Sequence, residues 1–209
     1  MLQFHIFGMR VTIDFLFVAL VTIFLLTDRT GISGIALLAC LIHELGHLVM
    51  FALVGYTPRA LSFELMGIRL SKPVQELSPG KEALVQLAGS ATNFLVFFLL
   101  AGTLDRITYA SLFAVTHLLL GVFNLLPLKS LDGGKLLELF CLRLFGERAA
   151  DAVTTAADLL TTAALLALSV YMVVTGSKSM TLMVFSGGLF VSLAAKLRAR
   201  ALPRRDAAE

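Results

Sequence analysis

The stretch LACLIHELGHLVMFALVGY, residues 38–56, is apolar at both ends and carries two histidines and a glutamate in its middle. The apolar residues continue upstream, so residues 32–54 are predicted to form one helix long enough to cross a bilayer. An ionisable side chain at the centre of a membrane helix costs about 2.5 to 3.5 kcal/mol on insertion scales, and such a residue therefore indicates function. His43, Glu44 and His47 are the first functional residues that the sequence predicts.

The spacing of these three residues suits a metal-dependent hydrolase. Residues four apart lie on one face of a helix, so His43 and His47 can both present a ring nitrogen to one metal ion. Glu44 lies beside the first histidine, where its carboxylate can handle a proton of a metal-bound water. The pattern His-Glu-x-x-His is typical of zinc metalloproteases. The alternative is a buried, hydrogen-bonded histidine pair that holds no metal.

The composition extends the membrane prediction to the whole chain. Of the 209 residues, 58% are hydrophobic and 15% are charged, which is more apolar than a soluble domain. We therefore predict an all-α polytopic membrane protein that forms a single domain, residues 1–209. The long apolar runs predict about six transmembrane helices, at residues 11–27, 32–54, 83–104, 107–128, 153–175 and 179–195.

The segment between the second and third predicted helices has a different period. In residues 59–71, Leu61, Phe63 and Leu65 alternate with polar residues before a turn near Gly67. A period of two predicts a short β-hairpin associated with the membrane. The hairpin either covers the membrane surface as an amphipathic element or offers a free edge that pairs with an extended peptide.

The distribution of basic residues favours a cytoplasmic orientation of both termini. With the N-terminus inside, fourteen of the 17 Lys and Arg residues fall on the cytoplasmic side, including those of the basic tail 196–209. This asymmetry follows the positive-inside rule and explains the basic tail without nucleic acid. Cys40 and Cys141 lie in apolar surroundings, where two buried thiols are more typical than a disulfide framework.

A catalytic zinc ion usually takes three protein ligands, so one more is required. The residues considered at membrane depth are His117, Asp132, Glu138 and Cys141. Asp132 is favoured because it lies in FNLLPLKSLDGGK, residues 123–135, where a proline ends a helix and two glycines permit irregular backbone. Irregular backbone at membrane depth is tolerated only beside a cavity or inside protein. His117 remains an alternative ligand, a packing residue or a partner of a ligand.

HELGH on a second membrane helix, followed by NLLPLKSLDGG, resembles the site-2 protease family of intramembrane zinc metalloproteases. The resemblance covers about residues 30–145 and is greatest to the compact branch that includes the sporulation-factor proteases. It implies one zinc ion held by His43, His47 and Asp132, with Glu44 as the catalytic base. It also implies a bacterial cytoplasmic membrane and a membrane-associated protein substrate, such as an anti-sigma or pro-sigma factor.

QLAGSATNF, residues 86–94, is similar to the Ala-Gly-Pro-x-x-Asn stretch of the same family. The resemblance implies that Asn93 lies close to the reacting peptide, with Asn124 a second candidate for substrate or oxyanion binding. Ordinary helix packing through small and polar residues is the alternative. This chain departs from the family at Ser90, which replaces a proline, and at Lys129 and Ser130, where apolar residues or proline are frequent.

The sequence thus predicts an enzyme that hydrolyses peptide bonds of membrane proteins in regulated intramembrane proteolysis. A catalytically silent relative that binds a membrane partner would usually have lost a ligand or the glutamate, and all four residues are present here. A metal transporter would distribute histidines and acids over several helices. A different membrane metalloprotease would take its third ligand from a distant glutamate.

Overall fold

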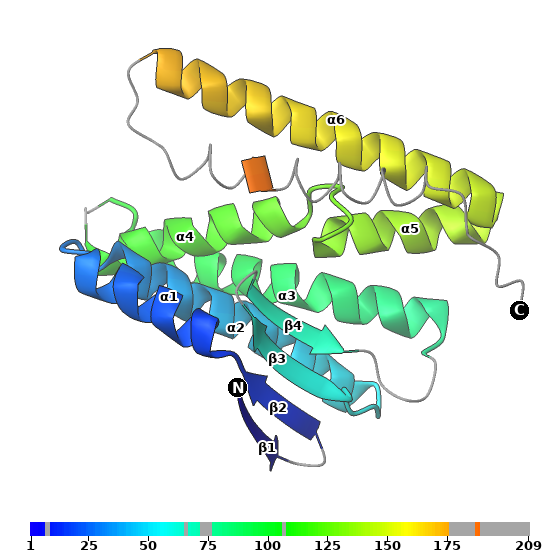
Figure 1. The fold of residues 1–209 in the computed structure, drawn as a ribbon, viewed down its shortest axis with the longest axis horizontal. Helices are drawn as coiled ribbons and strands as arrows, with labels where there is room; N and C mark the ends of the chain where they lie inside the picture. The colour runs from blue at the N-terminus through cyan, green and yellow to red at the C-terminus, as the bar shows by residue number, and fades with distance from the viewer. Residues whose placement is uncertain (7–8, 65–66, 72–76, 106–107, 176–186, 189–209) are drawn as a thin grey trace, which may run out of the picture. The chain divides into compact units, whose positions relative to one another are not determined.

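The computed structural model describes residues 1–6, 9–64, 67–71, 77–105, 108–175 and 187–188 (Figure 1). It divides into two compact units, residues 1–125 and 126–209, and each is described here by itself. Apart from residues 187 and 188, the predicted helix 179–195 lies outside the described residues, as does the basic tail 196–209. The single domain over the whole chain stays a prediction.

The described residues of the first unit form a sheet and four α-helices. Its elements are β1 (Leu2–Ile6), β2 (Met9–Ile13), α1 (Phe15–Thr27), α2 (Ile32–Leu53), β3 (Ala60–Glu64), β4 (Gly67–Ser71), α3 (Pro79–Leu100), the short 3-10 helix η1 (Ala101–Thr103) and α4 (Tyr109–Asn124). The strands form one sheet in the order β1-β2-β3-β4, in which β2 and β3 are parallel (Figure 1). The β3–β4 pair is antiparallel, with Ala60 opposite Ser71 and Glu64 opposite Gly67. The predicted hairpin at residues 59–71 is therefore confirmed.

The prediction of one helix over residues 11–27 is wrong at its start. Residues 9–13 form strand β2, and α1 begins only at Phe15. Val11, Thr12 and Ile13 are β-branched, which favours a strand, and they pair with β3. The Thr12 Oγ1 hydroxyl also donates a hydrogen bond to Ser62 Oγ, 2.8 Å away, across the two strands. The apolar run counted these residues toward a membrane span because hydropathy alone does not distinguish strand from helix.

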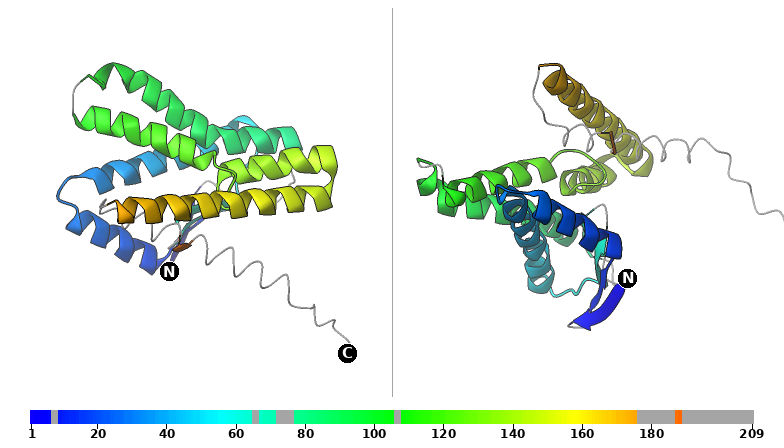
Figure 2. Two further views of the ribbon diagram at one scale, coloured as in Figure 1. Left: turned by 90° about the horizontal axis from the view of Figure 1, so that it is seen from above. Right: turned by 60° about the vertical axis from the view of Figure 1, so that its left-hand side comes forward.

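Helices α2, α3 and α4 pack against one another and carry the centre described below (Figure 2). Ala39, Ala88 and Ala114, one on each of these helices, are buried, and small buried residues suit a close approach of helix backbones. Helix α4 begins with a capping box, in which the Thr108 and Ser111 side chains each accept a backbone N–H of the other residue. It ends at residue 124 rather than at the predicted 128, because Pro127 cannot continue a helix.

The second unit contains α5 (Asp132–Phe145) and α6 (Glu147–Val174), which pack side by side (Figure 2). Gly146 separates them with a φ of 77°, a left-handed conformation that favours glycine. Helix α5 was not among the predicted spans because it is only 14 residues long and carries charged residues. The predicted span at 153–175 corresponds to α6, which begins six residues earlier.

Three described helical segments are long and apolar enough to cross a membrane: Ile32–Leu53, Pro79–Thr103 and Glu147–Val174. Phe15–Thr27 and Tyr109–Asn124 are shorter apolar helices. Many outward-facing side chains of these helices are large and apolar, as Leu53 of α2 and Leu99 of α3 illustrate with exposed fractions of 74% each. Such surfaces suit contact with lipid rather than water. The predicted fold class, a mostly helical membrane protein with a small sheet, is confirmed, while the number of six spans stays a prediction.

Candidate metal centre

His43 and His47 lie one turn apart on α2, and both are buried, with exposed fractions of 4% and 6%. Their Nε2 atoms are 3.2 Å apart, and their rings are nearly perpendicular. Zinc binds imidazole nitrogen at about 2.0 to 2.1 Å, so two nitrogens on one tetrahedral ion are about 3.3 Å apart. The facing Nε2 atoms therefore fit two ligand positions of a zinc ion.

The outer nitrogen of each ring has a partner on α3. His47 Nδ1 lies 2.7 Å from the backbone oxygen of Val85, which can only accept a hydrogen bond. The hydrogen of His47 consequently sits on Nδ1 and leaves the Nε2 lone pair for a metal. His43 Nδ1 lies 3.0 Å from the carboxamide Nδ2 of Asn93, and the Asn93 Oδ1 lies 2.9 Å from Nδ1 of His117 on α4.

Gly89 lies on α3 between Val85 and Asn93, the two residues that contact the imidazoles. Val85, Gly89 and Asn93 are four residues apart in turn and so share one face of the helix. A Cβ atom at Gly89 would contact Nε2 of His47 and would lie 2.6 Å from Nε2 of His43. Only glycine lets the α3 backbone approach the two imidazoles this closely.

A Gly89→Ala substitution is expected to displace the imidazoles and to lower the affinity for zinc. Overpacking of a buried contact typically costs about 1 to 3 kcal/mol, so the melting temperature should also fall. Gly80→Ala is the matched control on the same helix, because a Cβ there meets nothing within 4 Å. Zinc titration and thermal unfolding of both variants test this, and equal zinc affinity of Gly89→Ala and wild type would contradict the described packing.

Glu44 lies on α2 between the two histidines in sequence and is half-buried, in contrast to their full burial. Its carboxylate points from a neighbouring face of the helix, since successive residues are rotated by about 100°. A partly accessible carboxylate beside two buried imidazoles is suited to exchange protons with a water molecule at the centre.

Asp132 is the first residue of α5 in the second unit, and its side chain is buried. The helix N-terminus favours a negative charge at this position, and the Lys135 ammonium contacts Asp132 Oδ1 at 3.1 Å. The preceding loop turns tightly, with the Leu131 N–H donating to the Leu128 oxygen at 2.8 Å. A Cβ at Gly134 would collide with that same Leu128 oxygen, so glycine is required for the turn that presents Asp132.

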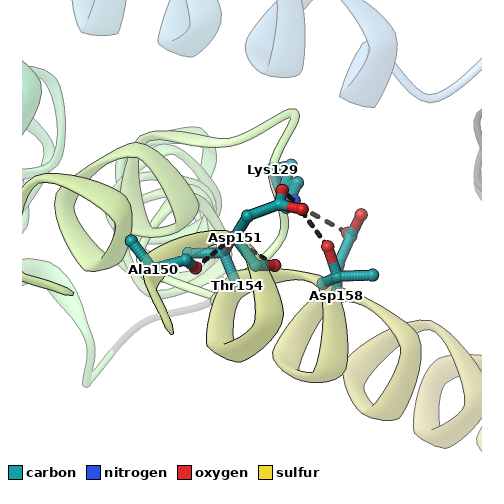
Figure 3. A network of polar contacts seen from close by, with 6 residues as sticks. Lys129, Ala150, Asp151, Thr154 and Asp158 are labelled. Carbon is teal, nitrogen blue, oxygen red and sulfur yellow. Dashed lines mark hydrogen bonds and ion pairs between the residues drawn. The ribbon is translucent and has the colours of Figure 1, made fainter. Parts of the chain in front are cut away.

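Lys129 ties this loop to α6 (Figure 3). Its ammonium contacts Asp151 Oδ1 at 3.0 Å and Thr155 Oγ1 at 2.7 Å, and its backbone N–H donates to Asp158 Oδ1 at 3.2 Å. Asp151 is 55% exposed, so its ion pair contributes little to stability. Asp158 is buried on a helix face that it shares with Thr154 and Thr162, and its burial makes its bond to the loop backbone the stronger anchor. Lys129, a departure from the resembling family, is thus accommodated by polar residues of α6.

An Asp158→Leu substitution is expected to release the loop before Asp132, because the Lys129 N–H loses its acceptor. Hydrogen exchange of the peptide covering residues 126–131 should become faster. Asp158→Asn is the matched control, since its carboxamide oxygen can still accept the same hydrogen bond. Unchanged exchange in Asp158→Leu would show that the loop is held by other contacts.

The remaining predicted residue, Asn124, ends α4 and is half-buried, with its Nδ2 donating to the Leu120 oxygen at 3.0 Å. The roles assigned to Asn93 and Asn124 in substrate binding stay predictions. Sequence reasoning missed Gly89 and Val85 as neighbours of the histidines. The four-residue spacing of Gly89 and Asn93 was the available signal, and it left contact with the reacting peptide and general helix packing as alternatives.

Comparison with known proteins gives three related findings. The family model "Peptidase family M50" matches residues 100–168. The Rip3 proteins of Mycobacterium tuberculosis strains Erdman and H37Rv, which are named as zinc metalloproteases, are 32% identical over 126 residues, or 55% of this chain and 32% of theirs. The chain therefore spans about a third of the length of these curated relatives.

The third finding is structural. The site-2 protease from Methanocaldococcus jannaschii matches with a TM-score of 0.67 at 15% identity, covering 93% of this chain and 94% of that chain. At this identity the likeness concerns the fold. The three findings confirm the resemblance to the site-2 protease family of metalloproteases. His43, His47 and Asp132 each offer one atom that can ligate a metal ion, and zinc is the cofactor that these findings support.

Proposed function

We propose that this relative of the site-2 proteases is an intramembrane zinc metalloprotease, which hydrolyses peptide bonds of membrane-embedded or membrane-associated proteins. The observation that carries the proposal is the pair of Nε2 atoms of His43 and His47, 3.2 Å apart inside an apolar helix, with Glu44 between them in sequence. A buried polar cluster of this kind is costly in a membrane and is expected only where it has a function.

His43, His47 and Asp132 would hold one zinc ion. Two imidazoles and a carboxylate are a common donor set of catalytic zinc, which keeps a further position for water or substrate. When bound, zinc supplies Lewis acidity, which lowers the pKa of a bound water to about 7 and polarises a peptide carbonyl. Val85 supports the set by fixing the tautomer of His47.

Glu44 would serve as general base and then as general acid. Its carboxylate takes a proton from the attacking water and passes that proton to the nitrogen of the leaving peptide. The peptide C–N bond breaks, and the products are a carboxylate and an amine. Its half-buried position supports this role, because the group must exchange protons with water.

The substrate would be an extended segment of a membrane protein. The sheet supports this because an exposed strand edge can pair with such a segment, and Asn124 is a further residue that could contact it. The resemblance favours regulated intramembrane proteolysis of an anti-sigma or pro-sigma factor. The distribution of Lys and Arg supports a topology with both termini in the cytoplasm, and the resemblance supports a bacterial membrane.

Cleavage by the purified chain in lipid nanodiscs tests the enzymatic proposal. A set of labelled transmembrane peptides is incubated with the protein, with the chelator-treated protein, and with the treated protein after zinc is restored. We expect cleavage that the chelator abolishes and that zinc restores, whereas magnesium does not. Cleavage that persists in the metal-free protein would contradict a zinc mechanism.

A further inference from the structure

Asn93 and His117 form a buried connection to His43 within the first unit. The carboxamide of Asn93 lies between two rings, 3.0 Å from Nδ1 of His43 and 2.9 Å from Nδ1 of His117. Both Asn93 and His117 have exposed fractions of 0%. Because bulk water does not reach them, their hydrogen bonds depend on one another.

Metal binding restricts the hydrogen-bond pattern of this connection. A neutral imidazole carries one hydrogen, so a histidine that binds a metal through Nε2 must carry it on Nδ1. The partner of His43 Nδ1 must then accept a hydrogen bond, and the acceptor of a carboxamide is its oxygen. In the structure the donor end of Asn93, Nδ2, faces His43. Turning the carboxamide by 180° places Oδ1 there and keeps both distances, because its two ends have nearly the same shape.

The turned carboxamide also sets a requirement on His117. In this orientation the Asn93 Nδ2 donates to Nδ1 of His117, so His117 carries its own hydrogen on Nε2. The Nε2 atom of His117 has no hydrogen-bond partner among the residues that the structure describes. No contact in that part of the chain therefore opposes this tautomer.

Packing keeps the connection in place. Gly121 brings the α4 backbone against α3, where a Cβ atom would lie 3.2 Å from the Asn93 Cβ and 2.9 Å from the Phe94 ring. The ring of His117 packs edge to face against Phe113, with centroids 4.5 Å apart. Asn93 can thus turn its carboxamide end for end but has little room to leave the two rings.

We infer that Asn93 and His117 are positioning residues that set the tautomer of His43 for metal binding. Asn93 accepts the Nδ1 hydrogen of His43 through Oδ1, and His117 holds the carboxamide in this orientation by accepting from Nδ2. The inference rests on the proposed function, because it takes His43 to bind zinc through Nε2. It gives Asn93 a role toward the ligand rather than the contact with substrate that the resemblance implied.

Zinc affinity of the full-length chain in detergent tests the role of Asn93. Apparent dissociation constants are measured by competition with a chromophoric chelator, and the visible spectrum of the Co²⁺-loaded protein reports ligand geometry. Loss of an outer partner of a ligating histidine typically weakens metal binding by about 10- to 100-fold, and we expect this for Asn93→Leu. Ser90→Ala is the matched control on the same helix, because it removes a buried hydroxyl for which the described part of the chain provides no hydrogen-bond partner. We expect it to leave both readouts unchanged.

A double-mutant cycle tests the role of His117 and remains informative if Asn93→Leu does not fold. His117→Phe keeps an aromatic ring beside Phe113 but cannot accept from Asn93. We expect it to weaken zinc binding in the wild-type background, because the carboxamide is free to present its donor end to His43. In an Asn93→Asp background the same change should have little effect on zinc binding, since both carboxylate oxygens accept and no orientation is wrong.

The outcomes separate the inference from the proposed function. A wild-type chain that binds no zinc would contradict both. A wild-type chain that binds zinc, with Asn93→Leu indistinguishable from it, would overturn only the inference. An equal loss caused by His117→Phe in both backgrounds would assign His117 to packing and overturn its positioning role.

Discussion

A Glu44→Gln chain is expected to bind zinc as the wild type does and to lose peptide hydrolysis by about 10²- to 10⁴-fold, the usual contribution of a general base. Glutamine has the size of glutamate but cannot take a proton from water. The histidines do not depend on the carboxylate for their Nδ1 partners, which lie on α3. Zinc content by mass spectrometry and the cleavage rate of a transmembrane peptide in nanodiscs measure the two effects separately.

The same chemical change elsewhere provides the control for Glu44. Glu147 lies exposed in the first turn of α6, and Glu147→Gln should retain full cleavage and zinc content. Residual cleavage by Glu44→Gln within a few-fold of wild type would assign the proton transfer to another group. If Glu44→Gln lost zinc together with activity, the result would instead show that Glu44 takes part in binding the metal.

An Asp132→Ala chain is expected to lose most of its affinity for zinc and all measurable cleavage. Removing a ligand should weaken binding by more than the about 10- to 100-fold that follows from losing an outer partner. The two histidines would remain, but catalytic zinc sites usually have three protein ligands. Chelator competition on the purified chain measures the change.

The ion pair between Lys135 and Asp132 supplies the control for this prediction. Lys135→Met removes the ammonium that contacts Asp132 Oδ1 and leaves the carboxylate itself in place. We expect a much smaller loss of zinc affinity for Lys135→Met than for Asp132→Ala. Full zinc retention by Asp132→Ala would remove Asp132 from the ligand set and favour a metalloprotease with a distant glutamate as third ligand.

The helices of the first unit were predictable where one apolar run coincided with one element. Helix α2, predicted at 32–54 and observed at Ile32–Leu53, has no competing interpretation because its length and hydropathy agree. Residues 9–13 were misjudged although their antiparallel partner β1 directly precedes them, because hydropathy alone was considered there and their other partner, β3, begins only at residue 60. Parallel pairing over that separation leaves no signal in the neighbouring sequence. Hydropathy then counts an apolar β-branched segment that adjoins a helix as part of that helix.

The metal-binding residue types were visible in the sequence, whereas their surroundings were not. The spacing of His43 and His47 follows from helix geometry alone. The contacts of Gly89 with the imidazoles, and of His117 with Asn93, depend on how α2, α3 and α4 pack. Lys129 likewise appeared only as a departure from a family pattern, because its partners on α6 lie more than 20 residues away.

The most direct test of the central claim, that this chain cuts membrane proteins with Glu44 as its base, is a mass-spectrometric survey of new peptide termini in membranes of the native host. Wild type and Glu44→Gln are compared in every growth state in which the protein is present. The account predicts termini inside or beside membrane segments that occur in the wild type and are absent from the mutant. Identical surveys in all growth states would contradict it and favour a relative that binds membrane partners without cutting them.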